Sequence, residues 1–342
     1  MNATGIKFIL VAGLLILGFC LEIALGSVQV SLAEMKAVFL GNTLSSDRSF
    51  VKDIIIESRI PRAFTAVLAG SGLALCGLLM QSMFRNPLAG PSVLGISSGA
   101  SLGVSLVFAG GLGFGISQQW LIDVSVSAAA MLGSLVVLAG VMMVSLRLRD
   151  HVSLLIFGLM TGYLCSALVT LVEFGASKEA IRSIVFWGMG SFASVSYFEL
   201  KLMALVIIPG CVAALLMSKK LNIMLLGKDY ARSLGLNYNR TTFHILLITG
   251  ALTGVITAYC GPIAFLGLAV PHVARIIFKK SDHLILLPAT LLCGAVLALF
   301  CDLISRLPGS DLSIPLNAIT SLIGAPVVIA LIFRNSRMKS WF

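Results

Sequence analysis

Apolar runs alternate with short polar segments along the whole chain of 342 residues. A helix that crosses a lipid bilayer needs about 20 predominantly apolar residues. We identify ten runs of this kind, of which the eighth is short; they lie near residues 8–28, 62–82, 93–110, 120–144, 152–172, 198–217, 242–259, 263–277, 284–303 and 315–333. No connection is long enough for a separate soluble domain. The pattern predicts one all-α integral membrane domain over residues 1–342, with about ten transmembrane helices.

The composition supports the same class. Hydrophobic residues make up 58% of the chain, charged residues 11%, and the mean hydropathy is +1.04. Soluble domains carry roughly 25% charged residues, so lipid is the predicted solvent for most of this chain. Glycines recur at a spacing of four, which predicts close helix packing in lipid; they are Gly95, Gly99 and Gly103, Gly158 and Gly162, and Gly250 and Gly254. The seven cysteines are scattered singly, which predicts apolar packing and neither a disulfide framework nor a zinc site.

The first run has two interpretations. Lys7 precedes it, and Ala24-Leu25-Gly26 resembles a signal-peptidase site, so the run is either a cleaved signal or a retained helix. The run is long for a signal sequence, which favours a retained helix. The topology of the rest of the chain is the same in both cases.

The net charge of +10 has a membrane explanation that needs no nucleic acid partner. Basic residues concentrate in alternate connections, near 83–92, 145–151, 218–241 and 276–283 and in the C-terminal tail, whereas the connections near 111–119 and 260–262 have none. The positive-inside rule places the basic connections, and both termini, in the cytoplasm. The outer segment 29–61 also contains Lys36, Arg48, Lys52 and Arg59, nearly balanced by Glu34, Asp47, Asp53 and Glu57. Arg59, and Arg62 just beyond it, are therefore expected to have a role outside.

Catalysis by this chain alone is not expected. The sequence has no G-x-x-x-x-G-K-[ST] loop to hold nucleotide phosphates, and its four histidines have no metal-binding spacing. It also has no nucleophile with a base nearby. We therefore expect no metal and no cofactor on this chain; if transport is driven by ATP, another subunit hydrolyses it.

Several ordered motifs cover nearly the whole chain from residue 59 onward. They are Arg59-Ile60-Pro61-Arg62; Gln81 with Arg85-Asn86-Pro87-Leu88-Ala89, Pro91, Leu94-Gly95 and Gly99-Ala100; Trp187 with Gly190-Ser191; Gly261 to Leu268 with Pro271-His272 and Arg275; and Asp282-His283, Leu287-Pro288, Asp302, Arg306 and Gly324-Ala325-Pro326. This set resembles the FecCD family, the permease subunits of ABC importers for iron chelates, haem and vitamin B12, with a type II fold. One departure is Leu312-Ser313-Ile314-Pro315, where members often have an acidic Glu-Leu-Pro.

The resemblance implies roles for three sets of residues. Outward arginines receive carboxylates of a substrate-binding protein, which points to Arg59, Arg62 and Arg306. Anchoring of helix ends at the headgroups is the alternative role. The inner loop 218–241 corresponds to the coupling segment that an ATPase subunit contacts; its expected contact residues are Gly227, Asp229, Ala231, Arg232, Ser233, Leu234 and Gly235.

The residues of this loop also indicate a short helix. Tyr230, Ala231 and Leu234 are expected to share one face of it, and Gly235 to end it. The segment with Trp187, Gly190 and Ser191 resembles a short outer helix that narrows the mouth of the pathway; an interfacial Trp is the alternative.

We therefore expect the permease subunit of a binding-protein-dependent importer in a bacterial cytoplasmic (inner) membrane, acting as a dimer of permeases. Its expected partners are an ATP-binding cassette ATPase and a substrate-binding protein. The cargo stays open among a ferric siderophore, haem and cobalamin. The alternative is an ion-coupled secondary transporter, which the few ionisable residues inside the spans disfavour.

Overall fold

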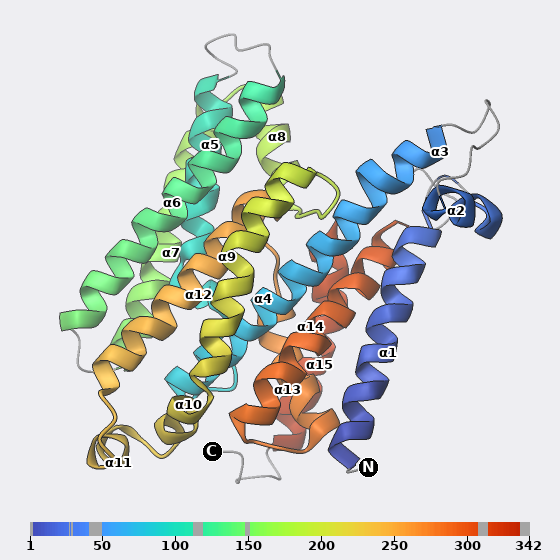
Figure 1. Cartoon of the computed structure of the whole chain (residues 1–342). Helices are drawn as coiled ribbons and strands as arrows, with labels where there is room; N and C mark the ends of the chain where they lie inside the picture. Colours follow the sequence, from blue (N-terminus) through green and yellow to red (C-terminus); the bar gives the residue numbers. More distant parts are fainter. Residues whose placement is uncertain are drawn as a thin grey trace.

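The computed structural model describes residues 3–26, 28, 30–40, 50–111, 119–147, 151–306 and 314–335. Within these residues every regular element is a helix, and the long helices run side by side between two ends of one bundle (Figure 1). In chain order the elements are α1 (Ala3–Ala24), α2 (Leu32–Phe39), α3 (Phe50–Asp53), the π-helix η2 (Ile54–Arg59), α4 (Ile60–Phe84), the 3-10 helix η3 (Pro91–Leu94), α5 (Ile96–Gly111), α6 (Gln119–Arg147), α7 (His151–Phe174), α8 (Lys178–Gly188), α9 (Tyr197–Leu216), α10 (Ser218–Leu225), α11 (Lys228–Ser233), α12 (Tyr238–Cys260), α13 (Leu266–Phe278), α14 (His283–Ser305) and α15 (Leu316–Asn335).

The ten predicted apolar runs are all confirmed as helices. Seven helices are long and apolar enough to cross a membrane, and α5, α13 and α15 contain shorter apolar stretches, in the part of the chain that the structure describes. The shortest is α13, because the chain from Gly261 to Phe265 runs outside a helix before α13 begins.

The outer segment before the second run is more helical than the sequence indicated. The predicted helix near 62–82 begins earlier, because α3, η2 and α4 form one continuous helical stretch, Phe50–Phe84. The π-turn of η2 shifts the hydrogen-bond register just before Arg59 and Pro61. A second short helix, α2, begins with a capping box in which Ser31 and Glu34 bind each other's backbone.

The core of the bundle is built around α4, α12 and α14. In α4, 83% of the apolar stretch is buried, whereas only 11% of that in α7 is, so α7 lies at the periphery. A Cβ atom on Gly77 would overlap the carbonyl of Gly267, which shows how closely α4 approaches α13. The seven cysteines are unpaired and only Cys20 is exposed, which confirms their predicted role in packing.

The glycine spacing also has the predicted consequence. A Cβ on Gly99 would lie 2.6 Å from the carbonyl oxygen of Gly133 in α6, and one on Gly158 would lie 2.5 Å from that of Val93. Gly95 precedes α5 with φ of +74° and faces α7 instead. Small residues thus let backbones touch where lipid provides no other driving force.

The connections divide between the two ends of the bundle. The short helices α10 and α11 lie at the same end as the start of α1, and α2, α3 and α8 lie at the opposite end (Figure 1). This division is the one that the alternating basic connections predict. The candidate site residues therefore fall into two groups, one at each end.

Candidate functional site

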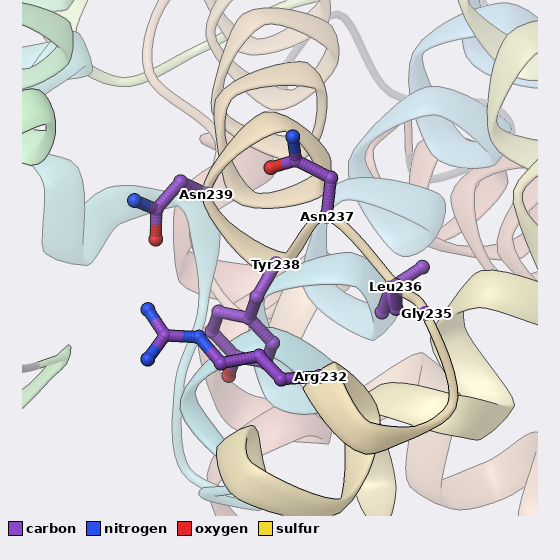
Figure 2. Close-up of a pocket in the computed structure, with 6 residues that line it drawn as sticks. All are labelled: Arg232, Gly235, Leu236, Asn237, Tyr238 and Asn239. Atoms are coloured by element: carbon purple, nitrogen blue, oxygen red, sulfur yellow. The ribbon is translucent and has the colours of Figure 1, made fainter.

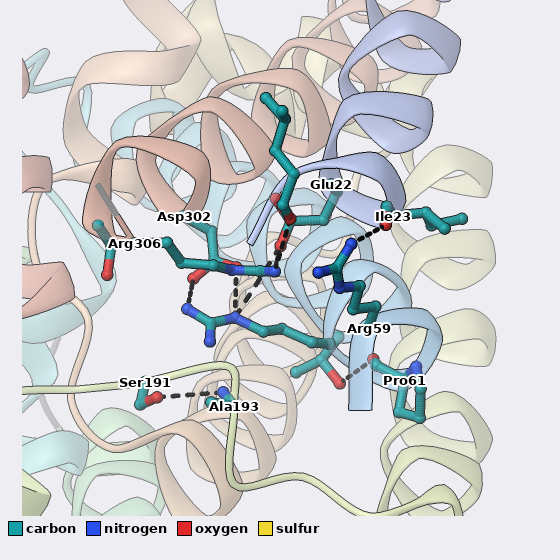
Figure 3. Close-up of polar contacts among 12 residues, drawn as sticks. Glu22, Ile23, Arg59, Pro61, Ser191, Ala193, Asp302 and Arg306 are labelled. Carbon is teal, nitrogen blue, oxygen red and sulfur yellow. Dashed lines mark hydrogen bonds and ion pairs between the residues drawn. The ribbon is translucent and has the colours of Figure 1, made fainter. Parts of the chain in front are cut away.

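Arg59 is buried at the α2–α8 end and binds the last turn of α1. It is 3% exposed, and its Nη1 donates to the carbonyl oxygens of Ile23 at 2.7 Å and Ala24 at 2.9 Å. Its contact with Ile23 is visible in Figure 3, and its Nη2 donates to the Val28 carbonyl at 2.5 Å. A helix ends with unsatisfied carbonyl groups and partial negative charge, so a guanidinium there is stabilising. The expectation that Arg59 is presented on the outer surface is corrected: its donors are used inside the chain.

Arg62 and Arg306 form a second cluster with two carboxylates. Arg62 Nε and Nη2 donate to the two carboxylate oxygens of Asp302, at 2.7 and 2.8 Å. Arg306 Nη2 binds Asp302 Oδ2 at 3.2 Å and is also ion-paired with Glu22 (Figure 3). Glu22 lies 3.9 Å from Arg62, so two arginines balance two carboxylates. The cluster joins α1, α4 and α14 at the α2–α8 end of the bundle.

The two pairs of charges differ in accessibility. The carboxylates are buried, with Glu22 at 0% and Asp302 at 1% side-chain exposure, whereas Arg62 and Arg306 keep 15% and 11%. Each guanidinium therefore has its acidic partner beneath it and a small part of its surface outside. This geometry holds both arginines in fixed positions, which is what bidentate recognition of an incoming carboxylate requires.

The opposite end carries the helix–glycine unit that the sequence predicted. Gly227 and Gly235 flank α11 with φ of +102° and +80°, a conformation that favours glycine, and the N–H of Gly235 donates to the Arg232 carbonyl. Ala231 is fully buried, whereas Tyr230 and Leu234 are 72% and 61% exposed. The expected shared face is corrected, because Ala231 points inward while the other two project outward.

The remaining predicted contact residues of this unit lie on its surface. Asp229, Arg232 and Ser233 are exposed, and the Ser233 hydroxyl donates to the Asp229 carbonyl at 3.1 Å. Beside them, a cavity of about 310 Å³ opens between α11 and α12 (Figure 2). It is lined by Arg232, Gly235, Leu236, Asn237, Tyr238 and Asn239. One small surface thus carries the exposed Tyr230 and Leu234, the basic side chain of Arg232 and this polar cavity.

Motif residues that are far apart in sequence meet just behind this surface. Arg275 Nη1 donates to Gln81 Oε1 at 2.7 Å, and Gln81 Nε2 donates to the Leu268 carbonyl at 3.2 Å. His272 Nε2 donates to the carbonyl of Pro87 at 2.7 Å. These contacts tie the turn after α4 to α13. Buried polar groups of this kind specify one arrangement when all are satisfied.

A second network links α10 to the same region. Asn222 Oδ1 accepts from both the backbone N–H and the Nδ1 of His283, at 3.0 and 2.7 Å, and His283 Nε2 lies 2.7 Å from the Ser82 hydroxyl. Asn222 Nδ2 donates to Asp282 at 2.7 Å. That bond and the Leu284 N–H lower the pKa of Asp282. The surface around α10 and α11 is thereby connected by hydrogen bonds to α4 and α14. No sequence motif had pointed to Asn222.

At the α2–α8 end of the bundle, the predicted gate segment begins in the last turn of α8 and continues into the turn that follows it. Trp187 is in the last turn of α8, and Gly190 has φ of +71°. The Ser191 N–H donates to the Cys260 carbonyl at 2.9 Å, and its hydroxyl accepts from the N–H of Ala193 at 3.1 Å. The three gate candidates therefore lie where α8 meets the end of α12. Their role in gating stays a prediction.

Comparisons with known proteins give one consistent result. Residues 14–334 match the model of the FecCD transport family. The vitamin B12 import system permease protein BtuC of Klebsiella pneumoniae is 37% identical over 281 residues, which cover 82% of each chain. The hemin transport system permease protein HmuU of Yersinia pestis is 34% identical over 331 residues, 95% of this chain and 97% of that one. An inward-facing metal-chelate type ABC transporter superposes with a TM-score of 0.83 at 30% identity, covering 96% of this chain and 99% of that chain.

Proposed function

Because the chain belongs to the FecCD transport family, we propose that it carries an iron chelate, haem or cobalamin into the cytoplasm as the membrane permease of an ABC importer. The match over residues 14–334 is the observation that carries this proposal. The relatives transport vitamin B12 and hemin by name, and the solved relative is of the metal-chelate type. The three cargoes share one chemical feature, which is that each is a large metal chelate.

The proposed motor is a separate ATPase subunit. The sequence contains no phosphate-binding loop, so we assign ATP hydrolysis to a partner and no catalysis to this chain. The contact surface is α11 with its flanking glycines, where Tyr230 and Leu234 project outward. The hydrogen bonds of Asn222 and Gln81 would transmit a displacement of this surface to α4, α13 and α14.

The proposed outer partner is a substrate-binding protein. Arg62 and Arg306 retain accessible guanidinium surface at the outer end, and we assign docking of its carboxylates to them. Complementary charge of this kind steers and orients association more than it tightens it. Arg59 contributes by fixing the end of α1, whose Glu22 completes the cluster. In this assignment α1 is a retained helix.

We also propose that two copies of this permease enclose the pathway. The apolar stretch of α7 is only 11% buried within the monomer, and residues such as Leu171 and Phe174 are exposed at 69% and 94%. A two-fold pair would let α7 and α15 of each copy line a shared axis. We assign the α10–α11 end, and both termini, to the cytoplasm; the basic residues of these connections support this assignment.

Uptake into proteoliposomes tests the proposal. The permease is reconstituted with the candidate ATPase and binding protein, and radiolabelled or absorbing cargo is offered in the three chemical classes. We expect uptake of one class that requires ATP, the ATPase and the binding protein together. Uptake driven by a sodium or proton gradient without the ATPase would establish a secondary transporter instead and overturn the proposal.

A further inference from the structure

Three chain segments at helix ends meet at the outer end of the bundle. They are the turn after α8 (Gly188 to Ser191), the extended segment between α12 and α13 (Cys260 to Phe265) and the first turn of α15. Segments of this kind leave backbone groups unpaired, and an unpaired group buried from water is costly. Several of these backbone groups bind across from one segment to another.

The side chain of Asn317, in the first turn of α15, binds three of them. Its Nδ2 donates to the carbonyl oxygens of Gly188 at 3.0 Å and Pro262 at 2.6 Å. Its Oδ1 accepts from the N–H of Ala264 at 2.9 Å. One amide thus contacts both other segments, and both of its donors and its acceptor are used. The sequence motifs did not include this residue.

Backbone contacts bring the same segments together. The Asn317 N–H donates to the Met189 carbonyl at 3.2 Å, in addition to the bond from Ser191 to Cys260. A Cβ on Gly261 would lie 2.5 Å from the Trp187 carbonyl oxygen, so the α8 turn and the segment before α13 are in direct backbone contact. Five hydrogen bonds in all connect the three segments, and three of them come from one side chain.

Packing along α15 supports the same unit from a second position. Phe265 has φ of +64°, a strained conformation for a residue with a side chain. A Cβ on Gly324 would lie 2.5 Å from the Cβ of Phe265, so α15 lies directly against this residue two turns beyond Asn317. Strained backbone persists only where its surroundings fix it. Asn317 thus contacts the middle of the segment and Gly324 lies against its last residue.

We propose that Asn317 is a positioning residue that joins the α8 turn, the segment 260–265 and the start of α15 into one rigid outer gate unit. Its importance for transport rests on the proposed function, since a gate is needed only if cargo passes there. The unit contains the gate candidates Gly190 and Ser191 and directly follows the third, Trp187, and the Asn317 amide holds this turn in place. Asn317 touches backbone and is not assigned to the cargo.

The chemistry of the amide makes the proposal specific. Asp has nearly the same shape, but its carboxylate has no donors and would face the carbonyls of Gly188 and Pro262. Leu has the same number of side-chain heavy atoms, although it is bulkier, and offers neither donor nor acceptor. If Asn317 served only to fill space, Asn317→Asp and Asn317→Leu would behave like the natural protein. If its hydrogen bonds position the segments, both variants fail.

Hydrogen exchange measured by mass spectrometry on the whole chain in nanodiscs tests this directly. We expect Asn317→Leu and Asn317→Asp to raise the rate of amide exchange in peptides covering 186–192 and 261–266 by about tenfold or more. Without the hydrogen bonds of Asn317, these segments open locally more often, and their N–H groups exchange when they do. Ser321→Ala, one turn further along α15, is the matched control and leaves these peptides unchanged. Peptides covering 218–226 report whether the rest of the bundle is folded.

The outcomes separate the two proposals. Unchanged exchange at both outer segments in the Asp and Leu variants overturns the positioning role, whatever the transport result. Loss of protection at 218–226 as well shows global unfolding, and the smaller Asn317→Ser substitution is then measured. If the outer segments of Asn317→Ser are as protected as those of the natural protein, the positioning role is also overturned. In proteoliposomes the expected signature is more ATP hydrolysed per cargo molecule. Absence of ATP-driven uptake by the natural protein would contradict the proposed function alone.

Discussion

Neutralising Asp302 should destabilise the outer end of the bundle strongly. Asp302 is 1% exposed and accepts three hydrogen bonds from guanidinium groups, at 2.7, 2.8 and 3.2 Å. Asp302→Asn would leave Arg62 and Arg306 with Glu22 as their remaining acidic partner. Removing one partner of a buried ion pair costs about 3–5 kcal/mol, because the remaining charge is desolvated and uncompensated. Asn keeps one acceptor oxygen, so we expect about 3 kcal/mol, which is about a hundredfold change in the unfolding equilibrium.

Thermal unfolding in detergent, followed with a thiol-reactive dye, measures this change. Six of the seven cysteines are buried, so the dye reports exposure of the core. The control is Asp53→Asn, which removes an exposed carboxylate from α3 and should leave the unfolding temperature unchanged. The double variant Asp302→Asn with Arg306→Gln leaves Arg62 with Glu22 and should be less destabilised than the sum of the single variants. A single variant as stable as the natural protein, or strict additivity of the two, would refute this interpretation of the cluster.

Three further predictions concern other parts of the molecule. Gly77→Ala should lower the free energy of unfolding by about 1–3 kcal/mol or prevent folding, since its Cβ would overlap the backbone of α13. Gly140→Ala is the matched control in the same unfolding assay, because a Cβ at Gly140 would meet no atom within 4 Å. Changing Tyr230 and Leu234 together to Ala should weaken co-purification of the ATPase without changing thermal stability, because both side chains are exposed; a large loss of stability would contradict a contact role. Because the pKa of Asp282 is lowered in the folded protein, its carboxylate stabilises the fold above the usual carboxyl pKa, and this stabilisation is lost as the pH falls through the lowered pKa. Asp282→Asn should remove this pH-dependent part of the unfolding free energy. An unchanged profile of stability against pH would contradict it.

The spans were predictable because the physics that forms them is local. Lipid requires long apolar helices with internal hydrogen bonds, so run lengths alone located all ten. The start of α4 was not located, because residues 50–61 are charged enough to read as a loop. They are helical through tertiary contacts: Val51 and Ile55 are fully buried against neighbours such as Phe19 of α1.

The site was predictable in part, for a similar reason. Resemblance pointed to Arg59, but the number of charges on a segment does not show which guanidinium is buried; the π-turn of η2 and the end of α1 decide that. The buried side of α11 was likewise set by contact with the rest of the bundle, which a helical pattern over six residues cannot reveal. Asn317 and Asn222 act on backbone groups far away in sequence, at separations of 129 and 61 residues. A single sequence does not show such pairings.

The accessibility of the α11 surface to a thiol reagent decides whether this end of the bundle lies in the cytoplasm. Ser233→Cys is introduced in a Cys20→Ser background, since Cys20 is the exposed natural cysteine. We predict that a membrane-impermeant thiol reagent labels this position in inside-out vesicles and not in intact cells, and that the assembled ATPase protects it or crosslinks to it. Labelling in intact cells, or equal labelling of inside-out vesicles with and without the ATPase, would contradict the proposal that this end of the bundle meets a cytoplasmic motor.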